Sequence, residues 1–284
     1  MLLGIHLSTF RRPTFEAALD AAAEQELDCI HVNFSLADLQ PLREQFDAAL
    51  VERFAAAAGK RKLDIVSVSG TFNMIHPDQS VRQEGMRRLE LAAAAAAALG
   101  GPLVTLCTGT RDPDDMWRAH PDNTSGVAWS DLLRSLERAL QIAEQHDVEL
   151  GIEPETSNVV QTAGAARQVL AEFESPRLKI ILDPANLFHH EELYRMLRAP
   201  NMGQLMRNRI EPAIDLLGPD IRMVHAKEIG PDGLPGGLGA GKGKINWRYI
   251  ITALKRAGFD GPVILHDLPE GDIEKAVDHL DECG

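Results

Sequence analysis

The chain has 284 residues, of which 44% are hydrophobic and 25% are charged, a mixture typical of a globular protein. Lysine and arginine number 29 against 42 acidic residues, so the formal net charge is −13. A protein that binds the phosphate backbone needs a basic face, and the sequence forms none, so the composition argues against a nucleic-acid partner.

Short apolar runs alternate with longer segments of helical periodicity along the whole chain. The predicted strands are residues 2–8, 28–34, 63–69, 103–108, 148–153, 178–183, 221–226 and 262–267. The predicted helices are residues 14–26, 42–58, 80–99, 130–146, 163–173, 191–217 (with a break near Pro200) and 247–257. No glycine-rich dinucleotide fingerprint follows the first strand, which argues against a doubly wound open sheet. Eight strand–helix units over about 250 residues predict an α/β protein in which residues 1–284 form a single (β/α)8 TIM-barrel domain.

The cysteines and the apolar segments indicate where the protein resides. Cys29, Cys107 and Cys283 lie far apart and form no CxxC pair, which indicates a reducing compartment and argues against a disulfide framework. The apolar start of the chain is too short for a signal peptide. The longest small-apolar run, residues 91–99, falls far short of the ~20 residues that a membrane span requires. We therefore expect a cytoplasmic protein without a membrane partner.

Polar residues at a spacing of two close several predicted strands, as expected where alternate side chains face a barrel interior. They are Gly4, His6 and Ser8; Cys29, His31 and Asn33; Glu153 and Glu155; and His225 and Lys227. The last four predicted strands each end on a potential metal ligand, namely Glu153, Asp183, His225 and His266. Carboxylate and imidazole together suit Mn²⁺, Zn²⁺, Fe²⁺ or Co²⁺ better than Ca²⁺. One such residue is most often a hydrogen-bonded or solvated rim residue, but four consecutive strand ends favour a metal site, because an unpaired charge in a barrel mouth is costly.

Three of these strand ends also carry a family resemblance. Ile-Glu-Pro at Glu153, Leu-Asp-Pro-Ala-Asn at Asp183 and Val-His-Ala-Lys-Glu at His225 resemble the xylose isomerase-like TIM-barrel superfamily. That group includes sugar isomerases, ketose 3-epimerases, inosose dehydratases and sugar phosphate isomerase/epimerases. Residues 72–78 are similar to its third unit, and residues 239–247 and 258–263 are similar to its last unit. The resemblance implies one divalent metal ion (Mn, Zn, Co, Fe or Mg), held by one residue from each of the last four strands; His266 takes the fourth position.

Two positions depart from the family pattern. Family members usually carry Glu where this chain has His266, and in the epimerases that Glu is the second acid/base group. The family often has His where this chain has Asn186, whose amide cannot act as a base at neutral pH. Both departures argue against a two-carboxylate mechanism and favour one in which Glu153 alone removes the proton next to a carbonyl. Lys227 is expected to hold an oxyanion or return a proton; a salt bridge to Glu155 is the alternative.

Substrate contacts are expected from polar residues around the barrel mouth. They are His6, Asn73, His76, Arg111, His120, Glu155 and Asn186. Arg111 and His120 follow the fourth predicted strand in a long segment of the kind that forms lids and substrate walls, with capping inside the loop as the alternative. Residues 230–243 hold seven glycines, which favours a flexible loop over a phosphate cradle. The methionine-containing segment 196–206 is expected to cover the mouth or to pack against a second subunit of a homo-oligomer.

Together these features predict a divalent-metal-dependent isomerase or epimerase that acts on a sugar, keto-sugar or polyol through an enediolate-type intermediate. The main alternative is a metal-dependent lyase or dehydratase, which shares the enolate step and which His266 fits at least as well. More remote alternatives are an endonuclease IV-like repair enzyme and an inactive sugar-binding barrel.

Overall fold

The computed structural model describes residues 1–36, 38–189, 193–195, 199 and 202–284. Eight parallel strands form a closed barrel in chain order, which confirms the predicted (β/α)8 barrel. The strands are β1 (Leu3–His6), β2 (Cys29–Val32), β3 (Asp64–Ser69), β4 (Leu103–Cys107), β5 (Leu150–Glu153), β6 (Leu178–Leu182), β7 (Ile221–Ala226) and β8 (Val263–Leu265). β8 closes the barrel by pairing with both β7 and β1.

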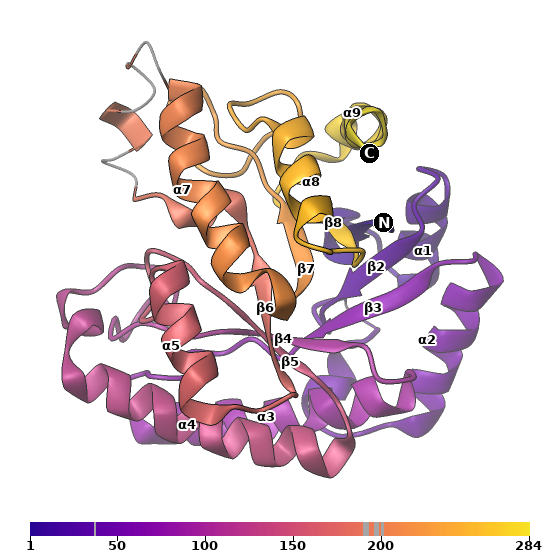
Figure 1. The fold of residues 1–284 in the computed structure, drawn as a ribbon. Coiled ribbons are helices and arrows are strands. Elements are labelled where there is room, and N and C mark those ends of the chain that lie inside the picture. Colours follow the sequence, from indigo (N-terminus) through magenta and orange to yellow (C-terminus); the bar gives the residue numbers. More distant parts are fainter. Residues whose placement is uncertain (37, 190–192, 196–198, 200–201) are drawn as a thin grey trace.

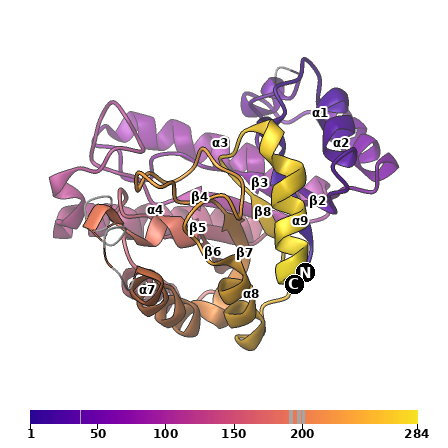
Figure 2. The same cartoon turned by 90° about the horizontal axis from the view of Figure 1, so that it is seen from above.

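Helices surround these strands, as Figure 1 shows from the side and Figure 2 from above. They are α1 (Phe15–Ala23), α2 (Ala48–Lys60), α3 (Gln79–Ala98), α4 (Gly126–His146), α5 (Ala163–Phe173), α7 (Met202–Leu217), α8 (Trp247–Arg256) and α9 (Ile273–Cys283). Short 3₁₀ helices are η1 (Leu7–Thr9), η2 (Gln40–Arg43), η3 (Pro121–Thr124), η4 (Pro184–Leu187), η5 (Gly218–Asp220) and η6 (Glu270–Asp272). No helix in the described ranges is both long enough and apolar enough to cross a bilayer.

Two helices begin at other residues than predicted, because side-chain caps set their first residues. Asp47 accepts a hydrogen bond from the N–H of Leu50, so α2 begins at Ala48 and the start of the predicted helix 42–58 belongs to η2. Ser125 accepts from the N–H of Ala128 in the same way, and α4 begins four residues before the predicted start. Helix α9 has no counterpart among the predicted helices. The predicted helix 191–217 and the segment 196–206 lie partly outside the described residues.

Two stacked layers of side chains fill the barrel. The lower layer is apolar and consists of Cys29, Leu103, Ile181, Met223 and Ile264. Gly4 belongs to the same level, because a Cβ there would lie 2.5 Å from both the carbonyl oxygen and the sulfur of Cys29. The residues two positions further along these six strands are His6, His31, Thr105, Asp183, His225 and His266. Since alternate side chains of a strand point the same way, this polar layer stands above the apolar one at the carboxyl ends of the strands.

The glycine-rich segment that follows β7 is tied to a buried carboxylate. Glu228 is fully buried and accepts hydrogen bonds from the backbone N–H groups of Gly243 and Ile245 and from the indole N–H of Trp247. Burial outweighs these donors and raises the pKa of Glu228 to about 7. The segment 230–243, expected to be flexible, is therefore anchored at its end by a group that changes charge near neutral pH.

We expect Glu228 to make the stability of the protein depend on pH. Its pKa rises from 4.5 to about 7 on folding, so between these values the folded chain keeps a proton that the unfolded chain has released. The contribution of Glu228 to the free energy of unfolding should therefore fall by about 3 kcal/mol as the pH rises through this window and then level off. Denaturant titrations of the wild type and Glu228→Gln across pH 4.5–8 measure this effect. The control is Asp232→Asn, which changes an exposed acid of the same loop. A wild-type/Gln difference that stays constant with pH would contradict the prediction.

Candidate functional site

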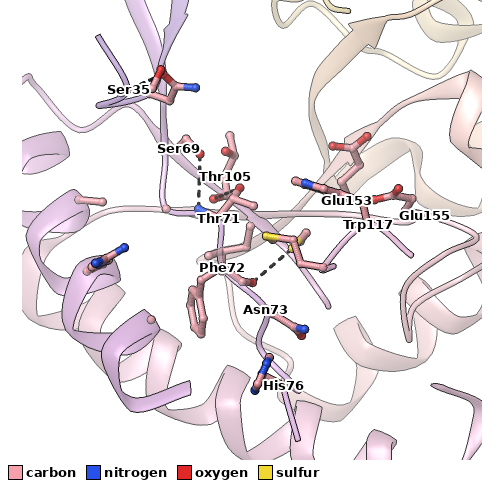
Figure 3. Close-up of a pocket in the computed structure, with 18 of the residues that line it drawn as sticks. Ser35, Ser69, Thr71, Phe72, Asn73, His76, Thr105, Trp117, Glu153 and Glu155 are labelled. Carbon is pink, nitrogen blue, oxygen red and sulfur yellow. Dashed lines mark hydrogen bonds between the residues drawn. The ribbon is translucent and has the colours of Figure 1, made fainter. Parts of the chain in front are cut away.

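A cavity of about 1060 Å³ opens at the carboxyl ends of the strands, where barrels of this kind carry their active sites. Most of the predicted site residues line it. They are His6, Asn73, His76, Glu153, Glu155, Asn186, His225, Lys227 and His266. Figure 3 shows Glu153 and Glu155 on one side of the cavity and Thr71 and Phe72 on the other.

Glu153 closes β5 and is one of the two acids on that side of the cavity (Figure 3). Its Oε1 accepts a hydrogen bond from Nδ2 of Asn186 at 2.6 Å, and its Oε2 lies 3.2 Å from Nδ1 of His225. Burial raises the pKa of Glu153, but His225 and Lys227 outweigh burial and lower it to about 2. The carboxylate is therefore ionised at neutral pH and able to accept a proton.

Asp183 and Lys227 form a buried ion pair next to Glu153. The Asp183 side chain, just after β6, is fully buried, and its Oδ2 lies 2.9 Å from Nζ of Lys227 without the alignment of a hydrogen bond. Nζ donates instead to Oδ1 of Asn186 at 2.7 Å. Burial opposes the charge on Lys227, but Asp183 and Glu153 outweigh burial and hold the pKa of Lys227 above its usual range. Lys227 is thus a cation, and its ion-pair partner is Asp183 where the sequence suggested Glu155.

His225 on β7 and His266 just after β8 stack against each other. Their rings are nearly parallel, with centroids 4.5 Å apart and an interplanar angle of 5°. Burial and the neighbouring His225 keep the pKa of His266 well below its usual range. His266 is therefore a neutral imidazole with a lone pair available for a ligand. The next residue, Asp267, has a φ of 52°, so the chain turns sharply after His266.

Asp183, His225 and His266 bring potential metal-ligand atoms close together, and several of these atoms make no hydrogen bond. Their ligand atoms all lie within 4.8 Å of one another. In the part of the chain that the structure describes, five buried side-chain atoms lack a hydrogen bond, and four of them belong to these three residues. Unsatisfied buried polar atoms are costly, and a metal ion removes that cost. A carboxylate and two imidazoles fit Zn²⁺, Fe²⁺, Mn²⁺ or Co²⁺. Glu153, the remaining predicted ligand, lies outside this trio.

Two further histidines complete a cluster of four imidazoles. His31 on β2 stacks on His6 with ring centroids 4.5 Å apart. Edge contacts join His6 to His266 at 5.7 Å and His31 to His225 at 6.1 Å. Burial lowers the pKa of His6 to about 4 and holds that of His31 well below its usual range, so both are neutral. Alternation along the predicted strand 28–34 marks His31 as inward-facing but assigns it no role.

Ser67 joins His31 to the barrel floor. Its Oγ lies 2.9 Å from Nδ1 of His31 and 3.3 Å from the sulfur of Met223. Sequence reasoning missed Ser67 because the register between β2 and β3 shifts at Ile30/His31.

Glu155 lines the same cavity two residues beyond Glu153. It accepts hydrogen bonds from Oγ of Ser157 at 2.8 Å and from Nδ2 of Asn158 at 3.2 Å. Burial and the negative charge of Glu153 raise the pKa of Glu155 to about 7. The two neighbouring acids therefore differ, since one stays ionised while the other exchanges a proton near neutral pH.

Asn73 and His76 line the cavity and also hold the surrounding loops. Nδ2 of Asn73 donates to the carbonyl oxygen of Thr110, and Oδ1 of Asn73 accepts from the backbone N–H of Thr110. Nε2 of His76 lies 3.0 Å from the carbonyl oxygen of Pro113. Both residues therefore connect the loop after β3 to the loop after β4. A direct role in substrate binding stays a prediction.

Arg111 and His120, also predicted to bind substrate, are not among the described residues that line the cavity. Arg111 forms an ion pair with Asp131 of α4 at 2.5 Å. His120 precedes η3 and caps it by accepting from the N–H of Asp122. These contacts match the capping alternative considered for this loop.

A closed (β/α)8 barrel with acids and imidazoles gathered at the carboxyl ends of β5 to β8 defines the class of the protein: a barrel with a candidate metal centre in its mouth. The model of the family named xylose isomerase-like TIM barrel matches residues 19–283, and the chain belongs to that family. No curated protein sequence matches the chain.

Several solved structures share the fold. The 3-keto-D-glucoside 4-epimerase of E. coli has a TM-score of 0.74 and 16% identity over 100% of both chains. The D-psicose 3-epimerase of Clostridium cellulolyticum H10 has a TM-score of 0.75 and 16% identity, covering 100% of this chain and 99% of its own. The protein described as the probable 3-DHS dehydratase AsbF of Bacillus anthracis has a TM-score of 0.72 and 16% identity over 99% of both chains. At such identities the similarity is one of fold.

Proposed function

We propose that the protein is a metal-dependent isomerase or epimerase acting on a sugar, keto-sugar or polyol. The observation that carries the proposal is the trio Asp183, His225 and His266, which holds four buried side-chain atoms without a hydrogen bond and lies beside the ionised Glu153. Membership of the xylose isomerase-like family, and sugar epimerases among the similar folds, support the same chemistry.

The trio would hold one divalent ion, Mn²⁺, Zn²⁺, Co²⁺ or Fe²⁺, which when bound would supply a Lewis acid for substrate oxygens. Glu153 removes the proton from the carbon next to the substrate carbonyl, since it is ionised and lines the cavity. Asn186 donates to Oε1 of Glu153 and so holds the carboxylate in place, with Oε2 3.2 Å from Nδ1 of His225. Lys227 stabilises the substrate oxygen on which negative charge develops, because it is a cation at the cavity wall.

Product analysis in heavy water tests the reaction. A panel of keto-sugars and aldoses is incubated with the protein in D₂O, and the products are analysed by mass spectrometry and NMR. We expect an isomer or epimer that has gained one deuterium and lost no other atoms. Chelation of the metal should abolish the reaction, and addition of Mn²⁺ or Co²⁺ should restore it. Turnover that survives complete chelation would overturn the proposal.

Elimination is the second candidate, and one observation favours it. The chain places His266 after β8, where the two-carboxylate mechanism needs an acid to return a proton from the opposite face. A lyase needs only the first proton removal, followed by departure of the group β to the carbonyl. A product that has lost water or a larger group in the same assay would establish elimination in place of isomerisation.

We expect the purified protein to bind about one equivalent of a divalent transition metal. Asp183→Asn and His225→Ala should each lower the affinity at least tenfold, because each removes one donor of the trio. Elemental analysis and competition with a chromogenic chelator measure the loss. The matched control is His76→Ala, which removes a cavity histidine whose Nδ1 accepts from the N–H of Asp78 at 3.0 Å and whose Nε2 lies 3.0 Å from the carbonyl oxygen of Pro113. Equal metal content in all four proteins would contradict the assignment.

A further inference from the structure

The three donors of the candidate metal site differ in the metals that they suit. His225 and His266 supply nitrogen, and only Asp183 supplies oxygen. Imidazole nitrogen suits Zn²⁺, Fe²⁺ and Co²⁺, whereas Mg²⁺ and Mn²⁺ prefer carboxylate, carbonyl and water oxygens. A magnesium or manganese ion at the trio would therefore need further oxygen ligands from the protein.

The carboxylate of Asp183 has one oxygen left for a metal ion, and a cation already lies beside it. Oδ1 accepts a hydrogen bond from the backbone N–H of Ala185 at 2.9 Å, which fixes the carboxylate at the start of η4. Oδ2 makes no hydrogen bond but lies 2.9 Å from Nζ of Lys227. Lys227 thus compensates the single negative charge of the trio. A metal ion that relies on attraction to carboxylates gains less from a charge that is already compensated.

The neighbouring glutamates have polar partners for all four of their carboxylate oxygens. Oε1 of Glu153 accepts from Asn186 at 2.6 Å, and its Oε2 lies 3.2 Å from Nδ1 of His225. Both oxygens of Glu155 accept from side chains of the loop after β5, at 2.8 and 3.2 Å. Figure 3 shows the two acids together on one side of the cavity. Either acid would have to give up these contacts to bind a metal ion.

The acid next to His266 is directed to a different part of the fold. Asp267 has a φ of 52°, and a Cβ at Gly236 would lie 1.8 Å from its Oδ2, so its carboxylate packs on the backbone of the loop after β7. The backbone N–H of Gly237 donates to the carbonyl oxygen of Asp267 at 2.7 Å. His266 is therefore the residue that faces the trio from the end of β8. Its Nδ1 is buried without a hydrogen bond, and its ring stacks on His225.

We propose that the trio selects Zn²⁺, Co²⁺ or Fe²⁺ over Mn²⁺ and Mg²⁺, and that His266 sets this selectivity. The inference rests on the metal trio of the proposed function and narrows the metals named there. His266 supplies a second nitrogen at a position where a carboxylate would supply both an oxygen and a further negative charge. The affinity of the site then comes mainly from imidazole lone pairs, which hard cations use poorly.

Competition with a chromogenic chelator measures the selectivity on the metal-free protein, with Zn²⁺, Co²⁺, Mn²⁺ and Mg²⁺ as separate probes. We expect the wild type to bind Co²⁺ at least about 100-fold more tightly than Mn²⁺, and Mg²⁺ more weakly still. Because most protein sites bind Mn²⁺ more weakly than Co²⁺, the decisive quantity is the change in this ratio on substitution. His266→Glu replaces a nitrogen ligand by a carboxylate, so it should lower the Co²⁺ to Mn²⁺ ratio about tenfold or more.

The matched control is His76→Glu, which adds the same carboxylate to the same cavity outside the trio and should leave the ratio unchanged. His266→Gln is a second variant in case His266→Glu fails to fold. Its neutral amide removes the nitrogen ligand without adding charge, so it should weaken Co²⁺ binding without strengthening Mn²⁺ binding.

Proton NMR of the Co²⁺-loaded protein supplies a readout that is independent of affinity. Each histidine ligand gives a strongly shifted ring N–H signal that disappears in D₂O. We expect two such signals from the wild type and from His76→Glu, and one from His266→Glu and His266→Gln. Wild-type binding of Mn²⁺ as tight as that of Co²⁺, a ratio unchanged in His266→Glu, or two signals that persist without His266 would overturn the inference.

The outcome is separable from that of the proposed function. If a sugar is turned over in a chelator-sensitive reaction but Mn²⁺ binds as tightly as Co²⁺, the selectivity fails and the proposed function stands. If the trio prefers Co²⁺ in a manner that depends on His266 but no sugar is turned over, the proposed function fails and the selectivity stands.

Discussion

The substitution Glu153→Gln is expected to lower kcat about 10²- to 10⁴-fold, which is the usual contribution of a positioned general base. Glutamine keeps the size of the side chain and can still accept the hydrogen bond from Asn186 that Glu153 accepts at 2.6 Å. It cannot accept a proton at neutral pH. Because the geometry is retained, the affinity for substrate should change far less than kcat. Steady-state kinetics and deuterium incorporation from D₂O both measure the loss.

The matched control for this variant is Glu149→Gln. Glu149 precedes β5 at the opposite end of the barrel and is paired with Arg222 at 3.0 Å. It lies far along the strand from the cavity, so kcat should stay within about twofold of the wild type. If Glu153→Gln retains a third or more of wild-type kcat while remaining folded, Glu153 is not the base.

The substitution Lys227→Met is expected to lower the free energy of unfolding by about 3–5 kcal/mol, the range for breaking a buried ion pair by removal of one partner. Asp183 is fully buried, so without Lys227 its charge is left unpaired in the barrel. The substitution also removes the donor to Asn186, which positions Glu153. Denaturant unfolding of the metal-free protein measures the effect. A divalent cation should recover more stability in the variant than in the wild type, since either positive charge compensates Asp183.

Lys242→Met is the control for the loss of Lys227. It removes the lysine of another Lys–Asp pair, in which Lys242 is 40% exposed and bonded to Asp272. Solvent-exposed ion pairs contribute about 0–1 kcal/mol to the free energy of unfolding, so this variant should be nearly as stable as the wild type. A loss of less than about 1 kcal/mol in Lys227→Met would show that Asp183 does not depend on its ion pair.

The barrel could be predicted from the sequence because periodicity is a local property. Alternation within each strand marks the inward-facing positions, and the polar layer of the structure lies two residues beyond the apolar one. The first residues of helices were less predictable where a side-chain cap sets the start of the helix. Asp47 and Ser125 act through caps that hydrophobic periodicity does not reveal.

The candidate site could be predicted only in part, because some site residues contact residues from distant segments of the chain. The donors at the ends of β6 to β8 follow directly from the strand pattern. The contact of His31 with Ser67 depends on a register shift between two strands, and no pattern within one strand contains it. Arg111 has the chemistry of a substrate ligand, but its actual partner Asp131 lies 20 residues further along the chain on α4.

Both halves of the chain contribute to the cavity. The lining residues from Leu42 to Trp117 all precede β5, whereas Glu153 and the metal donors all follow β4. A change in the lining from Leu42 to Trp117 therefore leaves Glu153 and the metal donors in place. A chimaera that joins residues before β5 of a relative to the second half of this chain should inherit a new substrate range while keeping its chemistry.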